Sequence, residues 1–503
     1  MMKGLIFGDS LYEVPRTSIA RTSGGHRIAT LLRKQGVDVE VVDFFNSWSL
    51  DELKKIVDSC SLDFIGFSLG LGKLDYEKTN QLITYTKECN KDIKVIVGGA
   101  HSLDEGFDGI DLYFKGFAEE AIPDLIEYFE TGIYRPDKIE TIMFPTTKHV
   151  INCNKHYPAI DLTKLRNEYT DNDFLSSREN LGLEVSRGCI FKCKFCSFAL
   201  IGKNKNDYIR DKEDIKQEII DNYNKWGVTN YSITDDTFND NEIKVDYLYE
   251  ISQEVDFDLN FMAYIRVDLL RAKPGSLDKM MKAGFKGMHF GIETLSLETS
   301  KSIGKGFTGE PLKAYLREIK DKYPNLNITS SFIIGLPNES YEQAAANIHE
   351  IVAEKLVDSA PLYPLGIPKK AEMHTDLSEF SLTWDKHGYE ELTVEEATKL
   401  LELPKYSMFK GIDLEVRSFS EVIWKNSHMN VFDAWLYTSK LKQEIHSSTN
   451  ISGWHCFAAS SDDITVDQRL GYTRLEWDWN SVKQSTEEFV QNYKRNKMAV
   501  FNN

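Results

Sequence analysis

In the sequence "EVSRGCIFKCKFCSF", residues 184–198, three cysteines follow a C-x3-C-x2-C pattern: Cys189, Cys193 and Cys196. The four other cysteines stand singly along the chain: Cys60, Cys89, Cys153 and Cys456. An odd number of cysteines in a chain of 503 residues is not typical of a disulfide framework. The clustered thiols instead predict a metal site in a reducing, cytoplasmic compartment.

The number of thiols in this loop separates two kinds of metal site. A structural zinc site takes four protein ligands, usually as two short pairs. The loop supplies three, and the nearest histidine downstream is His289. An iron–sulfur cubane held by three thiolates leaves one iron open to another ligand, which explains a set of three. The alternative is a zinc loop or a buried cysteine loop.

The first 150 residues alternate short apolar segments with amphipathic ones, which predicts a doubly wound parallel sheet. The predicted strands are 4–8, 37–45, 63–69, 93–100 and 111–116, the last as a short edge strand. The predicted helices are 24–36, 50–60, 76–90 and 119–130. In such sheets ligands bind beyond the carboxyl ends of the strands.

The alternation resumes after a polar stretch, 151–180, which we interpret as a linker. Six further strands are predicted: 181–186, 231–236, 261–266, 287–293, 328–335 and 359–366. Six consecutive βα units predict a partial (β/α)6 barrel of the TIM type, whose chemistry lies at the carboxyl ends of its strands. The cysteine loop directly follows the first of these strands.

After residue 368 the alternation fades and helical patterns predominate. The sequence thus predicts an α/β protein with four segments: a doubly wound domain, a linker, a partial barrel and a mostly helical part, at 1–150, 151–180, 181–368 and 369–503. The mostly helical part has one cysteine and cannot hold a second cysteine-ligated cluster.

The charge balance limits the partners. Lys and Arg total 60 against 78 Asp and Glu, a net charge of −18, which argues against a broad nucleic-acid-binding face. We interpret the basic run "YKRNK" near the C-terminus as a solvated helix end. No apolar run is long enough for a signal peptide or a membrane span, so neither is predicted.

The segment "RGCIFKCKFC" resembles the signature loop of the radical S-adenosylmethionine (SAM) superfamily. The resemblance implies that the open iron of a 4Fe-4S cluster chelates the amino and carboxylate groups of SAM. It also implies reductive cleavage of SAM to methionine and a 5′-deoxyadenosyl radical, with an electron donor such as flavodoxin or ferredoxin as partner. Phe195 matches the family position that lies against adenine.

The same resemblance gives roles to residues at the ends of later strands. The implied SAM-binding residues are Asp235, Asp236, Arg266, Glu293, Ile334 and Gly335, in addition to Phe195. Because side chains alternate along a strand, we expect one of the two aspartates to reach SAM and the other to cap the helix beginning near Asn241. Arg266 and Glu293 could instead pair with each other.

The first domain resembles the cobalamin-binding subclass of the superfamily, through "GFSLG", "VIVGGAHS" and "DLYFKGFAEEAIPDL". The implied cobalamin-binding residues are Ser10, Ser68, Gly70, Gly98, Gly99, His101 and Gly116. Small residues there would let a ligand approach the backbone closely. The lower-ligand pattern D-x-H-x-x-G is absent, and a domain that kept the fold but lost its ligand is the alternative.

Two further features of this domain have alternatives of their own. Arg16, Arg21 and Arg27 follow the first strand and could bind a phosphate or a carboxylate, although we favour a solvated loop. Methylthiotransferases also place a domain before the barrel, but theirs carries three cysteines for a second cluster. Here only Cys60 and Cys89 are present, and each lies in an apolar helical pattern that predicts a core position.

The leading functional prediction is a cobalamin-dependent radical SAM enzyme, which implies methyl transfer to an unreactive centre of a small molecule. A second hypothesis is radical rearrangement, oxidation or cyclisation without methyl transfer, on a small molecule or a peptide. A third is a non-catalytic iron–sulfur or zinc protein that serves as a binding module. The intact cysteine set argues against the third.

Overall fold

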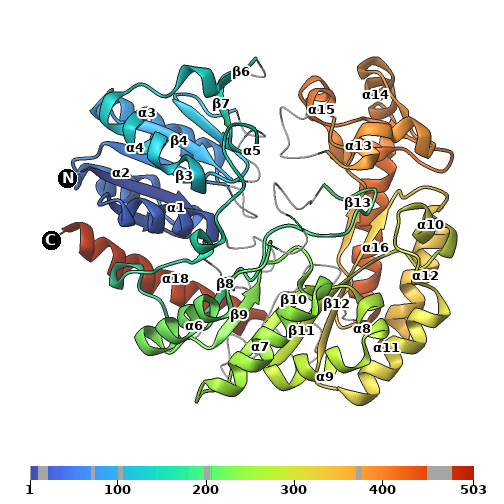
Figure 1. Ribbon diagram of the computed structural model, residues 1–503. Helices are drawn as coiled ribbons and strands as arrows, with labels where there is room; N and C mark the ends of the chain where they lie inside the picture. The colour runs from blue at the N-terminus through green and yellow to red at the C-terminus, as the bar shows by residue number, and fades with distance from the viewer. Residues whose placement is uncertain are drawn as a thin grey trace. The chain divides into compact units, whose positions relative to one another are not determined.

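A computed structural model describes most of the chain: residues 2–9, 21–69, 74–99, 103, 106–143, 146–177, 179–197, 204, 207–369, 377–449 and 479–502. The chain forms two compact units. The first comprises 1–184, 201–229 and 478–503, and the second comprises 185–200 and 230–477. Figure 1 shows the ribbon coloured along the chain.

The first unit contains a seven-stranded sheet in the order β2-β1-β3-β4-β5-β7-β6. Its strands are β1 (Lys3–Gly8), β2 (Asp38–Val42), β3 (Phe64–Ser68), β4 (Lys94–Gly98), β5 (Leu112–Lys115), β6 (Ile139–Met143) and β7 (Thr147–Asn152). All pairs are parallel except β6 with β7. The predicted parallel sheet is confirmed, but β5 is not an edge strand, because β7 pairs with it on its outer side.

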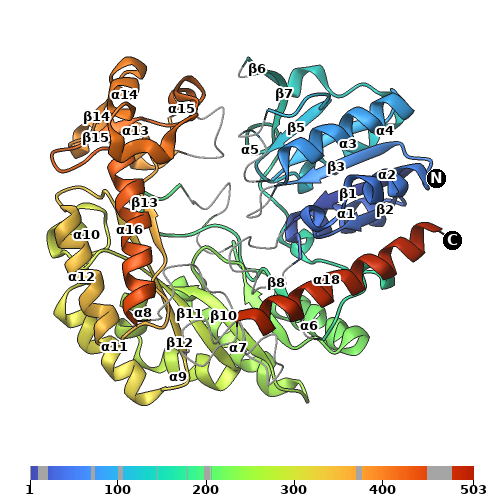
Figure 2. The ribbon, with the colours of Figure 1, turned by 180° about the vertical axis from the view of Figure 1, so that it is seen from behind.

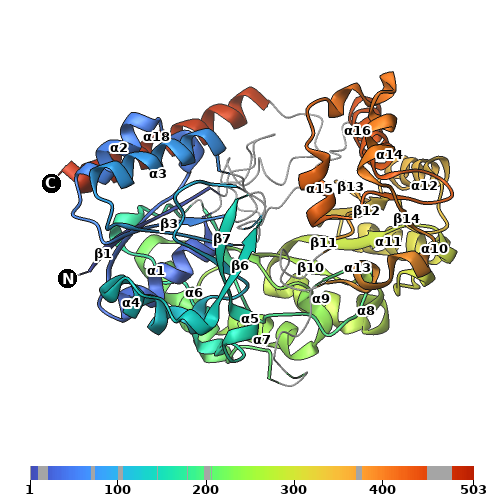
Figure 3. The same cartoon turned by 90° about the horizontal axis from the view of Figure 1, so that it is seen from above.

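Helices cover both faces of this sheet, as a doubly wound fold requires. The helices of the first unit are α1 (Ser23–Lys34), α2 (Leu50–Asp58), α3 (Tyr76–Cys89), α4 (Ile122–Thr131), α5 (Cys153–His156), α6 (Lys212–Trp226) and α18 (Trp479–Asn502). The short 3-10 helices are η1 (Phe45–Ser47), η2 (Glu119–Ala121), η3 (Pro136–Lys138), η4 (Leu162–Leu165) and η5 (Asp171–Asp173). Figure 3 shows α2 and α3 on one face and α1 and α4 on the other.

The core beneath α1 and α4 explains why these segments fold together. Phe64 of β3 and Phe129 of α4 stack with ring centroids 4.0 Å apart. Leu32 of α1 is completely buried in the same cluster. Each such side chain contributes roughly 1.5–3 kcal/mol by leaving water.

The segment 151–180 packs against α1 rather than forming a polar linker. The Asn167 side chain accepts a hydrogen bond from Arg27 Nε at 2.8 Å. The Glu168 amide donates to Thr30 Oγ1 at 2.9 Å. Strand β8 (Asn180–Leu183) follows this segment. It belongs to the first unit and precedes the cysteine loop in the sequence. Asn167 and Asp173 are 2% and 0% exposed, so part of the polar character of this segment belongs to buried residues.

The basic run near the C-terminus is also buried, contrary to the predicted solvated helix end. Lys494 and Lys497 of α18 are 7% and 0% exposed. Lys494 pairs with Glu52 at 2.9 Å and Lys497 with Glu40 at 2.6 Å. Helix α18 thus adds to the first unit, and Figure 2 shows it in red along the end of the sheet that carries β2.

The second unit contains a curled, half-barrel parallel sheet in which β9 to β13 follow the order β13-β12-β11-β10-β9. These strands are β9 (Asn230–Ile233), β10 (Asn260–Ile265), β11 (Phe285–Glu293), β12 (Asn327–Ile334) and β13 (Leu362–Pro364). The intervening helices are η6 (Phe238–Asp240), α7 (Glu242–Glu254), α8 (Val267–Ala272), α9 (Pro274–Ala283), α10 (Leu297–Ser302), α11 (Glu310–Lys322) and α12 (Tyr341–Ala353). Helices α7 to α12 line the outside of the curve in Figure 1. The predicted partial barrel is confirmed.

The remainder of the second unit is mostly helical, as predicted. It comprises α13 (Glu379–Thr383), η7 (Trp384–His387), α14 (Val394–Leu401), η8 (Pro404–Phe409), α15 (Leu414–Ser420) and α16 (Val431–Thr449), with a small antiparallel pair, β14 (Glu390–Glu391) and β15 (Trp424–Lys425). Helix α16 packs against β13, β12 and α12. Within the described ranges, no helix is both long enough and apolar enough to span a membrane.

Candidate active site

The start of the cysteine loop is anchored by Asp235, which follows β9. One oxygen of this carboxylate accepts hydrogen bonds from the Val185 and Ser186 amides, both at 2.9 Å. The other oxygen accepts from Ser186 Oγ at 2.6 Å and from Lys244 Nζ at 3.1 Å. Asp235 is 1% exposed and accepts four hydrogen bonds, so its carboxylate holds the start of the cysteine loop in place.

This arrangement divides the two predicted aspartates. Helix α7 is capped by Asn241, whose side chain accepts from the Ile243 amide at 3.0 Å. The expectation that one aspartate caps this helix is therefore wrong, because Asn241 does so itself. Asp236 is only half-buried and lies close enough to Cys189 to raise the pKa of that thiol. A contact between Asp236 and SAM stays a prediction.

The three cysteines are half-buried in one loop. Cys189 Sγ donates to Thr237 Oγ1 at 3.4 Å, and Arg266 Nη1 donates to Cys193 Sγ at 3.5 Å. Burial raises the pKa of the Cys189 thiol. The cationic guanidinium of Arg266 thus lies directly beside the Cys193 sulfur. The residues present thus fit a ligand set of three thiolates.

No three histidine, cysteine or carboxylate side chains converge, among the described residues, as a single metal ion requires. A cubane cluster does not need such convergence, because each thiolate binds a different iron. The two observations are therefore compatible.

Arg266 follows β10 and is held by two partners. Its guanidinium forms a bidentate pair with Asp268, at 3.0 and 2.7 Å. It also lies over the Phe191 ring at 4.0 Å from the centroid. Burial lowers the pKa of Arg266, but the bonds to Asp268 outweigh that effect and raise it. The group therefore stays cationic beside Cys193.

Glu293 ends β11 in an unusual backbone conformation, with φ of 68°. Its carboxylate is buried, which raises its pKa, and Lys305 opposes this effect from 3.4 Å. Ser331 Oγ donates to the same carboxylate at 3.4 Å. The alternative of an ion pair between Arg266 and Glu293 is wrong, since their ion-pair partners are Asp268 and Lys305.

The end of β12 is closed by aromatic residues from the later part of the second unit. The Gly335 carbonyl accepts a hydrogen bond from Tyr389 Oη at 2.9 Å, and the Ile334 carbonyl accepts from the Leu365 amide at 2.9 Å. Gly335 has φ of 101°, and a Cβ there would lie 2.6 Å from Trp424. Both predicted carbonyls thus have internal partners, and an adenine contact of this backbone stays a prediction.

Residues after 377 also reach the cysteine loop. The Phe380 amide donates to the Lys194 carbonyl at 2.9 Å, and Lys194 Nζ pairs with Glu379 at 3.4 Å. The buried rings of Phe380, Tyr389 and Trp424 follow one another at centroid distances of 6.0 and 5.3 Å. This aromatic series links the cysteine loop to the end of β12.

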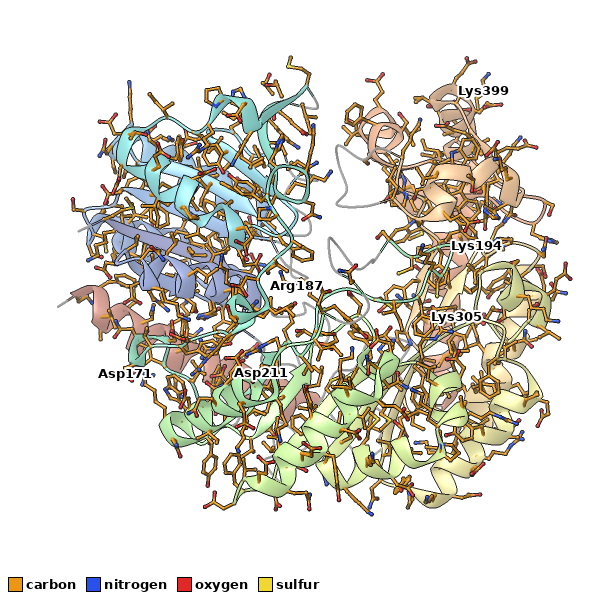
Figure 4. All side chains as sticks on the ribbon, in the orientation of Figure 1. Asp171, Arg187, Lys194, Asp211, Lys305 and Lys399 are labelled. Atoms are coloured by element: carbon orange, nitrogen blue, oxygen red, sulfur yellow. The ribbon has the colours of Figure 1, made fainter. Side chains whose placement is uncertain are left out.

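Lys305 is a site residue that the sequence reasoning missed. Its ammonium lies 3.4 Å from Glu293 Oε1 and 6.0 Å from the centroid of the Phe195 ring. Figure 4 labels Lys305 and Lys194, which lie near each other in the second unit. The segment "SIGKGFTG" that contains it, with glycines on both sides of the lysine, was the available signal.

In the first unit, the strand ends predicted to bind cobalamin are closely packed. Gly99 has φ of 108°, and a Cβ there would lie 2.3 Å from the Leu69 carbonyl oxygen. Gly116 has φ of 83° and would meet Asn154 Oδ1 at 2.6 Å. Internal packing therefore requires glycine at both positions.

The other predicted cobalamin positions fall into two groups. Ser68 and Gly98 end β3 and β4 at neighbouring register positions and are half-buried. Three further predicted residues lie outside the described ranges: Ser10, Gly70 and His101.

The arginines of the first unit do not form a solvated loop. Arg21 is 5% exposed and pairs with Glu179 at 2.5 Å and Asp43 at 3.0 Å. Arg27 is 4% exposed and pairs with Glu184 at 3.1 Å. Both therefore have protein carboxylates as partners, and Arg16 lies outside the described residues. In the sequence these arginines resemble a polar loop, because the carboxylates Glu179 and Glu184 that pair with them lie far away along the chain.

The predicted core positions of Cys60 and Cys89 are wrong. Cys60, after α2, is half-buried, and Cys89, at the end of α3, is exposed. Cys153 is the buried single cysteine among those described.

Comparison with known proteins identifies the domains. Residues 183–351 match the radical SAM superfamily, and residues 19–126 match the B12 binding domain. Residues 183–351 therefore form a radical SAM domain, and a B12 binding domain precedes it in the chain. The cofactors that follow are a 4Fe-4S cluster, SAM and cobalamin.

Two solved structures resemble the whole fold. The radical SAM methyltransferase TsrM from Kitasatospora setae, with tryptophan substrate and a SAM analogue bound, is 15% identical with a TM-score of 0.62, over 98% of this chain and 99% of that one. OxsB, a cobalamin-dependent SAM radical enzyme with aqua-cobalamin and SAM bound, is 14% identical with a TM-score of 0.55, over 99% and 83%.

A curated relative is more similar in sequence but covers less of the chain. A tRNA-2-methylthio-N(6)-dimethylallyladenosine synthase from Buchnera aphidicola subsp. Cinara cedri is 24% identical over 53% of this chain and 60% of its own length. The chain spans less than two thirds of the length of the curated relatives it matches.

Proposed function

We propose that this radical SAM enzyme uses cobalamin to transfer a methyl group from SAM to an unreactive carbon or phosphorus of a small molecule. The observation that carries the proposal is the occurrence of a B12 binding domain and a radical SAM domain in one chain. The similar fold of TsrM, a methyltransferase with tryptophan as substrate, supports a small molecule as substrate.

In this proposal three thiolates hold the cluster, those of Cys189, Cys193 and Cys196, and leave one iron open. Bound together, the cofactors supply an electron, a 5′-deoxyadenosyl radical and a transferable methyl group. Arg266, which stays cationic beside Cys193, offers a partner for the SAM carboxylate, and the Glu293 carboxylate offers one for its amino group or ribose.

Four further residues complete the proposed SAM site. Asp236 is the less buried of the two aspartates and is the one proposed to reach SAM, and Phe195 offers a ring for adenine. Ile334 and Gly335 would contact adenine through backbone atoms other than their carbonyl oxygens, which already accept hydrogen bonds. The aromatic series behind Gly335 would keep water from this end of the site.

Cobalamin is proposed to bind at the strand ends of the first domain, 1–150, and the radical SAM barrel is proposed to comprise 181–368. The proposed residues are Ser10, Ser68, Gly70, Gly98, Gly99, His101 and Gly116. An electron donor such as flavodoxin or ferredoxin is the proposed partner, and a reducing, cytoplasmic compartment suits a metal-binding cysteine loop.

The test is anaerobic reconstitution of the cluster with hydroxocobalamin, followed by desalting and addition of SAM and a reductant. We expect cobalamin to stay on the protein and both 5′-deoxyadenosine and S-adenosylhomocysteine to form. Deoxyadenosine without S-adenosylhomocysteine would favour radical rearrangement, oxidation or cyclisation. A Cys193→Ala variant that still cleaves SAM would contradict the cluster assignment.

Methylthio transfer to tRNA, the activity named for the curated relatives, has less support. Among the described residues, the cysteines of the first domain occupy three separate places, after α2, at the end of α3 and in α5. They come from three different elements, whereas a cluster loop such as 189–196 supplies its three cysteines from one short segment. The net charge of −18 also opposes an RNA partner.

A further inference from the structure

Lys305 makes several contacts near the cysteine loop that the proposed function does not explain. Its side chain is 14% exposed, and its ammonium donates to the Gly291 carbonyl at 2.8 Å. The same ammonium lies 3.4 Å from Glu293 Oε1. A Cβ on Gly291 would lie 2.7 Å from that oxygen and 3.2 Å from Lys305 Nζ. Glycine at this position therefore leaves room for the lysine and the glutamate to meet.

Glu293 needs a cation in this place. Its carboxylate is buried and would favour the neutral form, since burial raises its pKa. Among the groups that oppose burial, Lys305 acts most strongly, followed by Ser331 and the more distant Arg266. The positive φ of Glu293 also fixes the direction of its side chain, at a cost that neighbouring contacts must offset.

The loop that carries Lys305 is joined to the cysteine loop. The Lys194 amide donates to the Ile303 carbonyl at 3.2 Å. A Cβ on Gly304 would lie 3.9 Å from Cys193 Cα, so the two backbones run close together. One short loop therefore touches the proposed cluster ligands through its backbone and Glu293 through its side chain.

We infer that Lys305 is a positioning residue for SAM, acting through the Glu293 carboxylate. The lysine holds this carboxylate in a fixed position relative to the cysteine loop. The SAM carboxylate would then meet Arg266 and the SAM amino group would meet Glu293, both already in position. The inference rests on the proposed function, since it requires SAM to bind at the cysteine loop. It does not depend on whether methyl transfer follows.

The test compares three single variants of the full-length, anaerobically reconstituted protein. Lys305→Met keeps the length of the side chain and removes its charge, and Lys305→Arg keeps the charge. Lys301→Met is the matched control, because Lys301 is exposed on α10 four residues earlier. Iron content, SAM binding by equilibrium dialysis, and the change that SAM causes in the electron paramagnetic resonance spectrum of the reduced cluster are measured.

We expect Lys305→Met to retain iron but to bind SAM about tenfold or more weakly, the effect of losing one charge-assisted contact. Its cluster spectrum should respond to SAM only at correspondingly higher concentration. Lys305→Arg should recover most of the affinity, and Lys301→Met should match the wild type. Unchanged SAM affinity in Lys305→Met, or an equal loss in the control, would overturn the inference.

A double variant keeps the test decisive if Lys305→Met loses its cluster. Glu293→Gln/Lys305→Met removes both buried charges and leaves neither uncompensated. We expect it to bind SAM no more weakly than Glu293→Gln alone, because Lys305 acts through the carboxylate. A SAM affinity about tenfold lower in the double variant than in Glu293→Gln would refute the claim that Lys305 acts through the Glu293 carboxylate. Wild-type protein that fails to bind SAM would refute the proposed function instead.

Discussion

The contrast between Asp235 and Asp236 gives a sharp prediction about two adjacent carboxylates. Asp235→Asn keeps the acceptor for the Val185 and Ser186 amides but places an amide group against Ser186 Oγ and Lys244 Nζ, which are donors. Two charge-assisted bonds, at 2.6 and 3.1 Å, are lost. At roughly 1.5–3 kcal/mol for each bond, we expect a loss of about 3–6 kcal/mol in the free energy of unfolding.

Asp236→Asn should behave in the opposite way. Asp236 is half-buried, so we expect a change of less than about 1 kcal/mol in stability. Under the proposed function it should instead weaken SAM binding. The same amide substitution at neighbouring positions thus separates support of the loop from contact with SAM.

The assay is thermal and urea unfolding of the apoprotein, followed by iron content after reconstitution. Asp246→Asn is the matched control, because Asp246 forms a largely exposed ion pair with Lys279 and should cost less than about 1 kcal/mol. We expect Asp235→Asn alone to unfold early and to bind less iron. Wild-type stability and iron content in Asp235→Asn, or a larger loss in Asp236→Asn, would refute the reasoning.

Three further substitutions test other parts of the structure. Gly335→Ala should cost at least about 1–2 kcal/mol in thermal unfolding, since φ is 101° and the new Cβ would lie 2.6 Å from Trp424; an unchanged midpoint would contradict this. Burial raises the pKa of Glu339 to about 7 from 4.5, so the folded state binds the extra proton and stability falls as pH rises between these values. Glu339→Gln should flatten that slope in unfolding measured from pH 4 to 8, by up to about 3 kcal/mol, and a retained slope would assign it to another group. Lys497→Met should cost about 3–5 kcal/mol by leaving Glu40 without its buried partner, and a normal urea midpoint would show that the pair contributes nothing.

The parts of the fold that follow from local pattern were predictable from the sequence. Alternating apolar and amphipathic segments predict both parallel sheets, because period and composition are local properties. The C-x3-C-x2-C loop likewise carries its chemistry in its spacing. The hairpin formed by β6 and β7 was missed, since "TKHVIN" in β7 alternates polar and apolar residues in a short segment of modest hydrophobicity.

The structural roles that were missed depend on partners far away in the sequence. Arg21 resembles a solvated cation until Glu179, 158 residues later, is placed beside it. Gly335 resembles a turn residue until Trp424 occupies the space of its missing side chain. Neither burial nor pairing of such residues can be deduced from neighbours along the chain, because it arises only when distant segments pack.

Helix α18 has a consequence for biosynthesis. Its Lys497 meets Glu40, a residue made 457 positions earlier, and Tyr493 Oη accepts from the Asp43 amide at 3.0 Å. During translation the sheet of the first unit therefore emerges early, while the helix that covers its β2 end is still unmade. At about 5–20 residues per second, the nascent chain waits roughly half a minute or more with that end exposed. In this interval the surface that α18 later covers is open to a chaperone that shields nascent chains.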